Sequence, residues 1–382
     1  MSSLRNLLTV VLALAALCFA QPASAQEPIK VGAFLSVTGG ASFLGDPQAK
    51  TLRLYIDKMN ASGGVLGRKL QLVLYDSQGD ARQAVTFVRR LIEDDKVDFI
   101  IGGSTTGETM AVAPMVEQAG IPFFSMAGAS VVVEPVKKWI FKTAGSDRMA
   151  VARIYSDMQK RGAKNIGLIA GSGGFDQSCR LEAKNLASKF GITLAADETY
   201  APTDTDVTPQ LTRINSAKVD AILSCGFGAP TVITVRNYKQ LAMKTPFYFT
   251  HGVGSQQFVD GAAGAADGVR VTVSAVLVAN ELSADDAQRN VVQSYAKEYQ
   301  AAYNEKPAAF GGFAYDALQI TVEAVKRAGS TDKQKVRDEI EKTKNFVGLN
   351  GIFDITAADH MGLKPDAFRL TEISGGEWKL LK

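Results

Sequence analysis

The sequence predicts an α/β protein of two lobes, each built around a doubly wound parallel sheet. Short apolar runs alternate with longer stretches of helical period from Ile29 onward, and this alternation is typical of βαβ units with right-handed crossovers. The same pattern starts again near residue 149. The chain has 382 residues, more than the roughly 100–200 residues of one ordinary domain. Repetition and length together indicate two similar lobes in tandem.

Residues 1–25 have the pattern of a secretory signal peptide. Arg5 precedes an apolar stretch over residues 7–19, and a small-residue cleavage signal ends at Ala25. The apolar stretch is shorter than the roughly 20 residues of a membrane-spanning helix, and Leu17 is too large to precede a lipid-modified Cys18. We therefore expect cleavage after Ala25 and export of a soluble protein to the periplasm. An uncleaved membrane anchor is the alternative.

The first lobe is predicted from apolar runs and the helical stretches between them. Buried parallel strands read as continuous apolar runs. Such runs occur at residues 29–36, 70–75, 99–102 and 122–126, and helices are expected over residues 47–60, 81–93 and 109–118. Pro47 suits the first turn of a helix, and the glycines of segment 60–64 suit the positive φ found at a helix end.

The second lobe is predicted from the repeat of this pattern, after a crossing expected at residues 139–143. Strands are expected at residues 165–170, 192–198, 221–225 and 246–250, and helices at 149–161, 176–190, 208–216 and 230–241. A further apolar run at 269–276, helices at 284–303, 311–328 and 333–344, and a strand-rich tail follow. The pattern alone leaves open which lobe these helices join, and a return to the first lobe is our interpretation.

Charge and cysteine content exclude several partners. The formal net charge is only +3, and acidic and basic residues alternate along the helices, so no nucleic-acid partner is expected. Cys179 and Cys225 remain after signal cleavage, and they form either a disulfide or two buried thiols. No cysteine or histidine pair has the spacing of metal ligands, so we expect no metal and no cofactor.

Motifs of catalysis are missing, so we expect that the protein is not an enzyme. The sequence contains two histidines, His251 and His360, and no G-x-S-x-G nucleophile motif. Gly40 and Gly45 have the spacing of a phosphate-binding loop, but Asp46 follows where that loop requires a lysine. A periplasmic enzyme remains the alternative from another functional class.

Several segments resemble one family of transport proteins. These segments are Asn60-Ala-Ser-Gly-Gly-Val-Leu-Gly-Arg-Lys-Leu70, Ile100-Ile-Gly-Gly-Ser-Thr-Thr106, Ala119-Gly-Ile-Pro122 and Gly311-Gly-Phe-Ala-Tyr-Asp316. Here the chain resembles the leucine/isoleucine/valine-binding family of type I periplasmic binding proteins, the substrate-binding components of ATP-driven ABC importers. The resemblance implies two Rossmann-like lobes joined by three hinge crossings, with the ligand between the lobes.

The resemblance also implies lobe boundaries and partners. Lobe 1 would comprise residues 26–143 and 277–353, and lobe 2 residues 144–276 and 354–382. The partners would be a small-molecule ligand and the membrane subunits of an ABC importer, and we expect a monomer. A ligand-sensing domain of the same fold is a further alternative, but such domains usually continue into a membrane helix, whereas this chain stops at Lys382.

A carboxylate-binding region is expected in lobe 1. Ligands of doubly wound sheets bind beyond the carboxyl ends of the strands. Ser104, Thr105 and Thr106 follow such a strand and offer hydroxyls and N–H groups at a helix N-terminus, which suits an anion. In the family, the corresponding loops hold the ligand's carboxylate. Thr106 is the best match for the hydroxyl donor, and ordinary N-capping is the alternative. A second small-residue loop offers main-chain N–H groups at Ala127, Ala129 and Ser130.

The second lobe lacks one expected feature of an amino-acid site. Amino-acid binders of the family pair the ligand's ammonium with an acidic residue, which would fall in segment 250–254, and this segment contains His251 and no acid. A buried ammonium without a counter-charge is costly. Phe43, Phe175 and Phe227 on the cleft loops favour a flat apolar ligand body. The Thr250-His-Gly252 loop and Asp359-His-Met-Gly-Leu363 resemble the branch of the family that takes up aromatic carboxylates. This resemblance implies a benzoate, hydroxybenzoate, phenyl-keto acid or cinnamate as the ligand. A branched-chain or other amino acid is the alternative.

Overall fold

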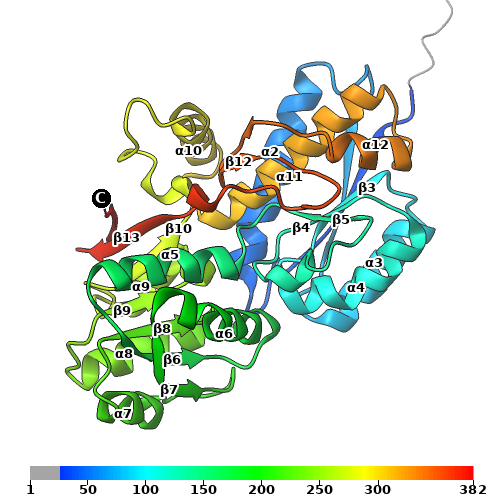
Figure 1. Ribbon diagram of the computed structural model, residues 1–382. Coiled ribbons are helices and arrows are strands. Elements are labelled where there is room, and N and C mark those ends of the chain that lie inside the picture. Colours follow the sequence, from blue (N-terminus) through cyan, green and yellow to red (C-terminus); the bar gives the residue numbers. More distant parts are fainter. Residues whose placement is uncertain (1–25, 382) are drawn as a thin grey trace, which may run out of the picture.

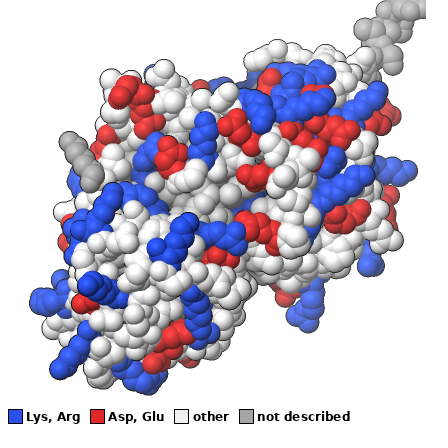
Figure 2. All heavy atoms as spheres, viewed as in Figure 1, with Lys and Arg blue, Asp and Glu red and all other residues white. Residues whose placement is uncertain are grey.

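The structure is a computed structural model that describes residues 26–381 (Figure 1). The signal peptide predicted at residues 1–25 lies outside these residues. Within the described range, no helix combines the length and the apolar composition needed to span a bilayer. Positive and negative side chains are mixed over the face shown in Figure 2.

The sheet of lobe 1 has five parallel strands in the order β2-β1-β3-β4-β5. Its strands are β1 Ile29–Leu35, β2 Leu70–Asp76, β3 Phe99–Gly102, β4 Phe123–Ser125 and β5 Ile140–Lys142. The helices α2 Ser42–Ala61, α3 Ala81–Glu93 and α4 Thr106–Ala119 connect them. The strand order reverses beside β1, and the crevice at such a reversal is where ligands bind in doubly wound sheets.

Lobe 2 contains a seven-stranded sheet in the order β14-β13-β10-β9-β8-β6-β7. Its parallel strands are β6 Asn165–Ala170, β7 Thr193–Thr199, β8 Ala221–Cys225, β9 Phe247–Phe249 and β10 Arg270–Val273. Its helices are α5 Asp147–Lys160, α6 Gly174–Ala187, α7 Thr208–Ser216, α8 Ala229–Gln240 and α9 Gln256–Ala262. A disulfide between Cys179 and Cys225 joins α6 to β8, which settles the alternative that the sequence left open.

The chain then returns to lobe 1, as interpreted from the sequence. Helices α10 Arg289–Tyr303, α11 Ala309–Ala328 and α12 Lys333–Ile340 follow, and α11 packs along α2 (Figure 1). A short hairpin, β11 Phe346–Val347 and β12 Ile352–Phe353, comes next. The last strands, β13 Arg369–Ser374 and β14 Glu377–Leu380, extend the lobe 2 sheet in antiparallel fashion. Three segments therefore cross between the lobes, and the predicted fold class is confirmed.

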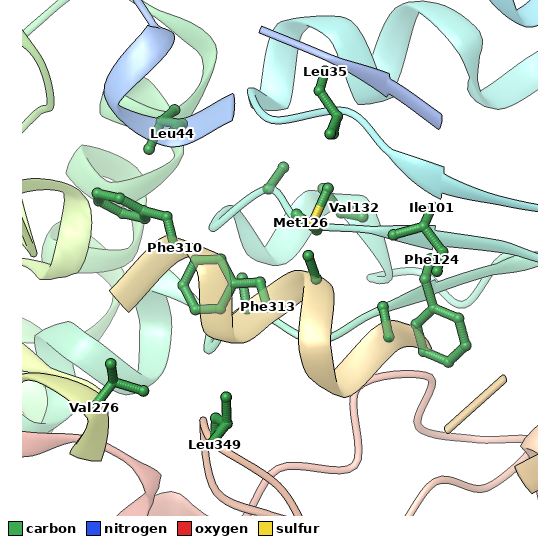
Figure 3. Close-up of a cluster of buried hydrophobic side chains, with 14 of the residues drawn as sticks. Leu35, Leu44, Ile101, Phe124, Met126, Val132, Val276, Phe310, Phe313 and Leu349 are labelled. Atoms are coloured by element: carbon green, nitrogen blue, oxygen red, sulfur yellow. The ribbon is translucent and has the colours of Figure 1, made fainter. Parts of the chain in front are cut away.

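Buried apolar side chains fill the space where α11 meets lobe 1. Phe310 and Phe313, from the first turn of α11, belong to the same hydrophobic cluster as Leu44 of α2 and Met126 after β4 (Figure 3). The cluster packs α11 against the segments of lobe 1 that come earlier in the chain. It also places the N-terminus of α11 beside the cleft.

Two expectations about the chain near the cleft are wrong. Helix α2 begins at Ser42 rather than at residue 47, so Pro47 lies inside the helix. The early start brings Gly45 against the Ser36 backbone, where an added Cβ would lie 2.2 Å from the Ser36 oxygen. Residues 139–143 are not a crossing segment, because most of them form β5, which pairs with β4. Apolar Ile140 and Phe141 gain more from burial in the sheet than an exposed crossing could provide.

Candidate ligand-binding site

A cavity lies between the lobes, beyond the carboxyl ends of the parallel strands. Its empty volume, including the solvent at its opening, is about 360 Å³. Both lobes contribute to it, and the lining residues are Leu44, Ser104, Thr105, Thr106, Met126, Gly128, Phe175, Phe227, His251, Gly252, Phe310 and Phe313. The lining is therefore largely apolar, with hydroxyl groups from lobe 1 and an imidazole from lobe 2.

The start of α4 offers one free hydroxyl. The Thr105 hydroxyl caps the helix, because it accepts a hydrogen bond from the Glu108 N–H and donates one to the Glu108 carboxylate. The Ser104 hydroxyl donates to Gln48 Oε1 at 2.6 Å and accepts from the Ser36 N–H at 3.1 Å. Both residues line the cavity, but protein partners occupy their hydroxyls, contrary to the sequence-based expectation.

Thr106 differs from its two neighbours. Its Oγ1 is buried and has no hydrogen-bond partner among the described residues. Thr106 and Gly107 open α4, and the first N–H groups of a helix have no partner within the helix. A buried polar atom without a partner is costly. The hydroxyl and the helix N-terminus are therefore arranged for an oxygen-bearing ligand.

The loop after β4 reaches the cavity through Gly128, a residue that the sequence analysis did not select. Ala127 and Ser130 use their N–H groups internally, toward Ser125 Oγ at 3.1 Å and Asp147 Oδ1 at 3.0 Å. The Ala129 carbonyl accepts a hydrogen bond from the Lys142 ammonium. None of these three predicted residues lines the cavity, because the small-residue loop lies one position out of the expected register.

Gly128 is also a point where the two lobes contact each other beside the cavity. A Cβ added to it would lie 2.6 Å from His251 Nε2 and 2.8 Å from Phe175 Cε2. Gly128 belongs to lobe 1, whereas both rings belong to lobe 2. The lobes are therefore in direct contact here, and the structure represents a closed arrangement.

His251 is a buried and neutral imidazole. Both ring nitrogens lack a hydrogen-bond partner among the described residues. Burial, followed by the charge of Lys142, lowers the pKa of His251 to about 3. At neutral pH the ring therefore has one N–H donor and one acceptor nitrogen. Phe175 packs edge-on against it at 5.3 Å between centroids, and Phe368 packs on it at 4.8 Å.

Aromatic rings form most of the apolar lining. Phe175 and Phe227 of lobe 2 pack edge-on with 6.1 Å between their centroids. Phe310 and Phe313 of α11 complete the lining from lobe 1. Phe43, predicted as a direct contact, lies outside the lining and packs behind Phe227 at 6.2 Å and Phe310 at 5.6 Å.

The charge of the lining is decisive for the choice of ligand. None of the lining residues is acidic, so no carboxylate faces an ammonium in the described site. In the described part of the chain, no group of three or more histidine, cysteine, aspartate and glutamate residues could hold a metal ion. The site can donate hydrogen bonds to an oxygen atom and pack aromatic rings around an apolar body, but it offers no counter-charge for an amine.

Comparison with known proteins identifies the family. The model of the periplasmic binding protein family matches residues 28–377. The chain belongs to this family. Several of its curated relatives are leucine/isoleucine/valine-binding proteins. A Leu/Ile/Val-binding protein of Rhizobium johnstonii is 26% identical over 95% of this chain and 96% of its own length. A leucine-, isoleucine-, valine-, threonine- and alanine-binding protein of Pseudomonas aeruginosa is 24% identical over 84% of each chain.

Solved structures of other ligand-binding proteins share the fold. An extracellular ligand-binding receptor from Rhodopseudomonas palustris HaA2 superimposes with a TM-score of 0.87 at 28% identity, over 93% of this chain and 100% of the other. A branched-chain amino acid transporter substrate-binding protein from Streptococcus pneumoniae, in complex with isoleucine, has a TM-score of 0.81 at 23% identity, over 93% and 99% of the two chains. The second likeness concerns the fold alone. These relatives are solute-binding proteins.

Proposed function

We propose that this periplasmic binding protein captures a small aromatic carboxylate and presents it to the membrane subunits of an ABC importer. The observation that carries the proposal is the composition of the cavity. Thr106 and the α4 N-terminus offer donors for a carboxylate, aromatic rings enclose an apolar body, and no lining residue is acidic. Benzoates, hydroxybenzoates, phenyl-keto acids and cinnamates have this combination of groups.

Capture occurs by hinge closure of a monomer, without catalysis. We assign residues 26–143 and 277–353 to lobe 1, and residues 144–276 and 354–382 to lobe 2. The end of β5 at Lys142 and the return of β13 and β14 to the second sheet support these boundaries. A ligand that touches Thr106 in lobe 1 and His251 in lobe 2 stabilises the closed form through its differential contacts. We also propose that the protein is exported and that the leader at residues 1–25 is cleaved after Ala25.

Binding of branched-chain amino acids is the second candidate. It is favoured by the names of the relatives, several of which are leucine/isoleucine/valine-binding proteins. The described cavity opposes it, because an α-ammonium would be buried without a carboxylate partner.

A thermal-shift screen separates the two candidates. A ligand that binds only the folded protein stabilises it, by about 2.7 kcal/mol at a ligand concentration of 100 times Kd, and so raises its melting temperature. We expect benzoate, 4-hydroxybenzoate, phenylpyruvate or cinnamate to raise the melting temperature, and L-leucine to leave it unchanged. A rise with L-leucine and none with these acids would contradict the proposal. Recovery of each acid unchanged after incubation checks that no reaction occurs.

A further inference from the structure

A buried lysine lies behind the loop that forms one wall of the cavity. Lys142 ends β5 and its side chain is wholly buried. Its ammonium donates to the Ala129 carbonyl oxygen at 3.1 Å. An ammonium has three donors, yet this carbonyl is its only hydrogen-bond partner in the described structure, and no described carboxylate lies within ion-pair distance of it. A buried cation without a bonded anion is costly.

The position of Lys142 connects it to the ligand. Its bonded partner, Ala129, directly follows Gly128, and Gly128 touches the His251 ring from the cavity side. The loop of Gly128 and Ala129 therefore separates the lysine charge from the cavity. Burial lowers the pKa of the His251 imidazole, and the positive charge of Lys142 lowers it further.

The charged groups around Lys142 leave it protonated at neutral pH. Asp147, at the start of α5, and Glu134, after the loop, both favour its charged form, whereas burial lowers its pKa to about 8. Asp147 Oδ1 accepts hydrogen bonds from the N–H groups of Ser130 and Arg148, whereas its buried Oδ2 has no partner among the described residues. The remaining neighbour with an ionisable ring, His360, accepts the Lys142 backbone N–H with its carbonyl oxygen.

We propose that Lys142 determines the charge selectivity of the site. An ammonium held behind the Gly128 loop favours a ligand with a carboxylate and disfavours a ligand with an ammonium, without touching either. Lys142 is thus a specificity-determining residue that acts through its field. The inference deepens the proposed function and rests on it for the ligand class.

The test compares benzoate with benzamide, which have the same ring but differ in charge. Calorimetric titration of Lys142→Met should show about tenfold weaker benzoate binding and benzamide binding within twofold of the original protein. Lys142→Arg should retain most of the preference for benzoate. Lys160→Met, at the exposed end of α5, is the matched control and should change neither ligand. An unchanged ratio of benzoate to benzamide affinity in Lys142→Met would overturn the inference.

A pH series on the unmodified protein avoids any folding defect of the variants. Lys142 loses its charge as the pH passes about 8, while His251 remains neutral throughout. The preference for benzoate over benzamide should therefore fall between pH 7 and pH 9.5. A constant ratio over this range would also refute the role of Lys142.

A measurement without ligand distinguishes this inference from the proposed function. In an NMR titration, His251 should begin to protonate at a higher pH in Lys142→Met than in the original protein. If benzoate fails to bind the original protein, the proposed ligand class is wrong, and the His251 titration alone then decides whether the lysine field reaches the site. An identical titration of His251 in both proteins would refute it.

Discussion

Gly128→Ala tests whether the lobes close around the ligand as the structure shows. The added methyl group would lie 2.6 Å from His251 Nε2 and 2.8 Å from Phe175 Cε2. Neither ring can move aside freely, because His251 is packed between Phe175 and Phe368. Overpacking of this kind costs about 1–3 kcal/mol. The cost falls on the closed form alone, because Gly128 and the two rings belong to different lobes.

The expected effect is therefore on ligand binding and not on folding. At about 1.4 kcal/mol per tenfold change, affinity should weaken roughly 5- to 150-fold. Calorimetry with the strongest ligand of the thermal-shift screen measures the affinity, and small-angle scattering measures closure. Gly40→Ala is the matched control, because an added Cβ there has no heavy atom within 4 Å and its φ is not positive. Wild-type affinity in Gly128→Ala would refute the closed geometry.

Two further predictions concern the hydroxyls beside the cavity and one concerns a buried acid. Thr106→Val should weaken a carboxylate ligand about 10- to 150-fold, since a hydrogen bond to a charged group contributes about 1.5–3 kcal/mol, while denaturant unfolding stays unchanged; equal affinity would remove Thr106 from the site. Thr105→Ala should instead cost about 1 kcal/mol of stability, because it removes the N-cap, and a loss of affinity without a loss of stability would contradict this assignment. Burial raises the pKa of Asp176 to about 6. The folded protein therefore holds the proton of Asp176 more tightly than the unfolded chain, and the resulting contribution to the free energy of unfolding is lost as the pH rises from about 4 to 6. Asp176→Asn should therefore melt at a higher temperature than the original protein above pH 6, with the difference shrinking toward pH 4; a difference independent of pH would argue against a buried, titrating Asp176.

The repeated βαβ pattern was sufficient to predict the architecture. Most of the parallel strands are short apolar runs because they are buried on both faces, whereas the edge strand β7 is polar and partly exposed. Boundaries were less predictable near the cleft. The start of α2 depends on the approach of Gly45 to Ser36, and the strand at Ile140–Lys142 depends on its pairing with β4. Both are contacts between segments and leave no local pattern.

The candidate site was likewise predictable only in part from the sequence. Thr106 and His251 could be selected because each follows a strand at the cleft edge of its sheet. The roles of Ser104 and Thr105 could not be separated from that of Thr106, since their partners Gln48 and Glu108 are fixed by tertiary packing and by capping geometry.

Other members of the site carried weaker signals. Phe310 and Phe313 lie three positions apart at the start of α11, which the sequence predicted only from residue 311. This spacing would have indicated a shared face had the helix been placed at the cleft. Which residue of the loop at Gly128 faces the cavity depends on the backbone conformation, which the sequence does not show. Lys142 gave no signal, because a lysine in a sequence is ordinarily exposed.

The most direct test of the account compares phenylpyruvate with L-phenylalanine by calorimetric titration of the purified protein. The two molecules share the ring and the carboxylate, and they differ in whether a keto oxygen or an ammonium occupies the α-carbon. A cavity with donors at Thr106, a neutral His251 and no acidic lining residue should bind phenylpyruvate at least tenfold more tightly. Tighter binding of L-phenylalanine would contradict the claim that the site recognises a carboxylate without an ammonium.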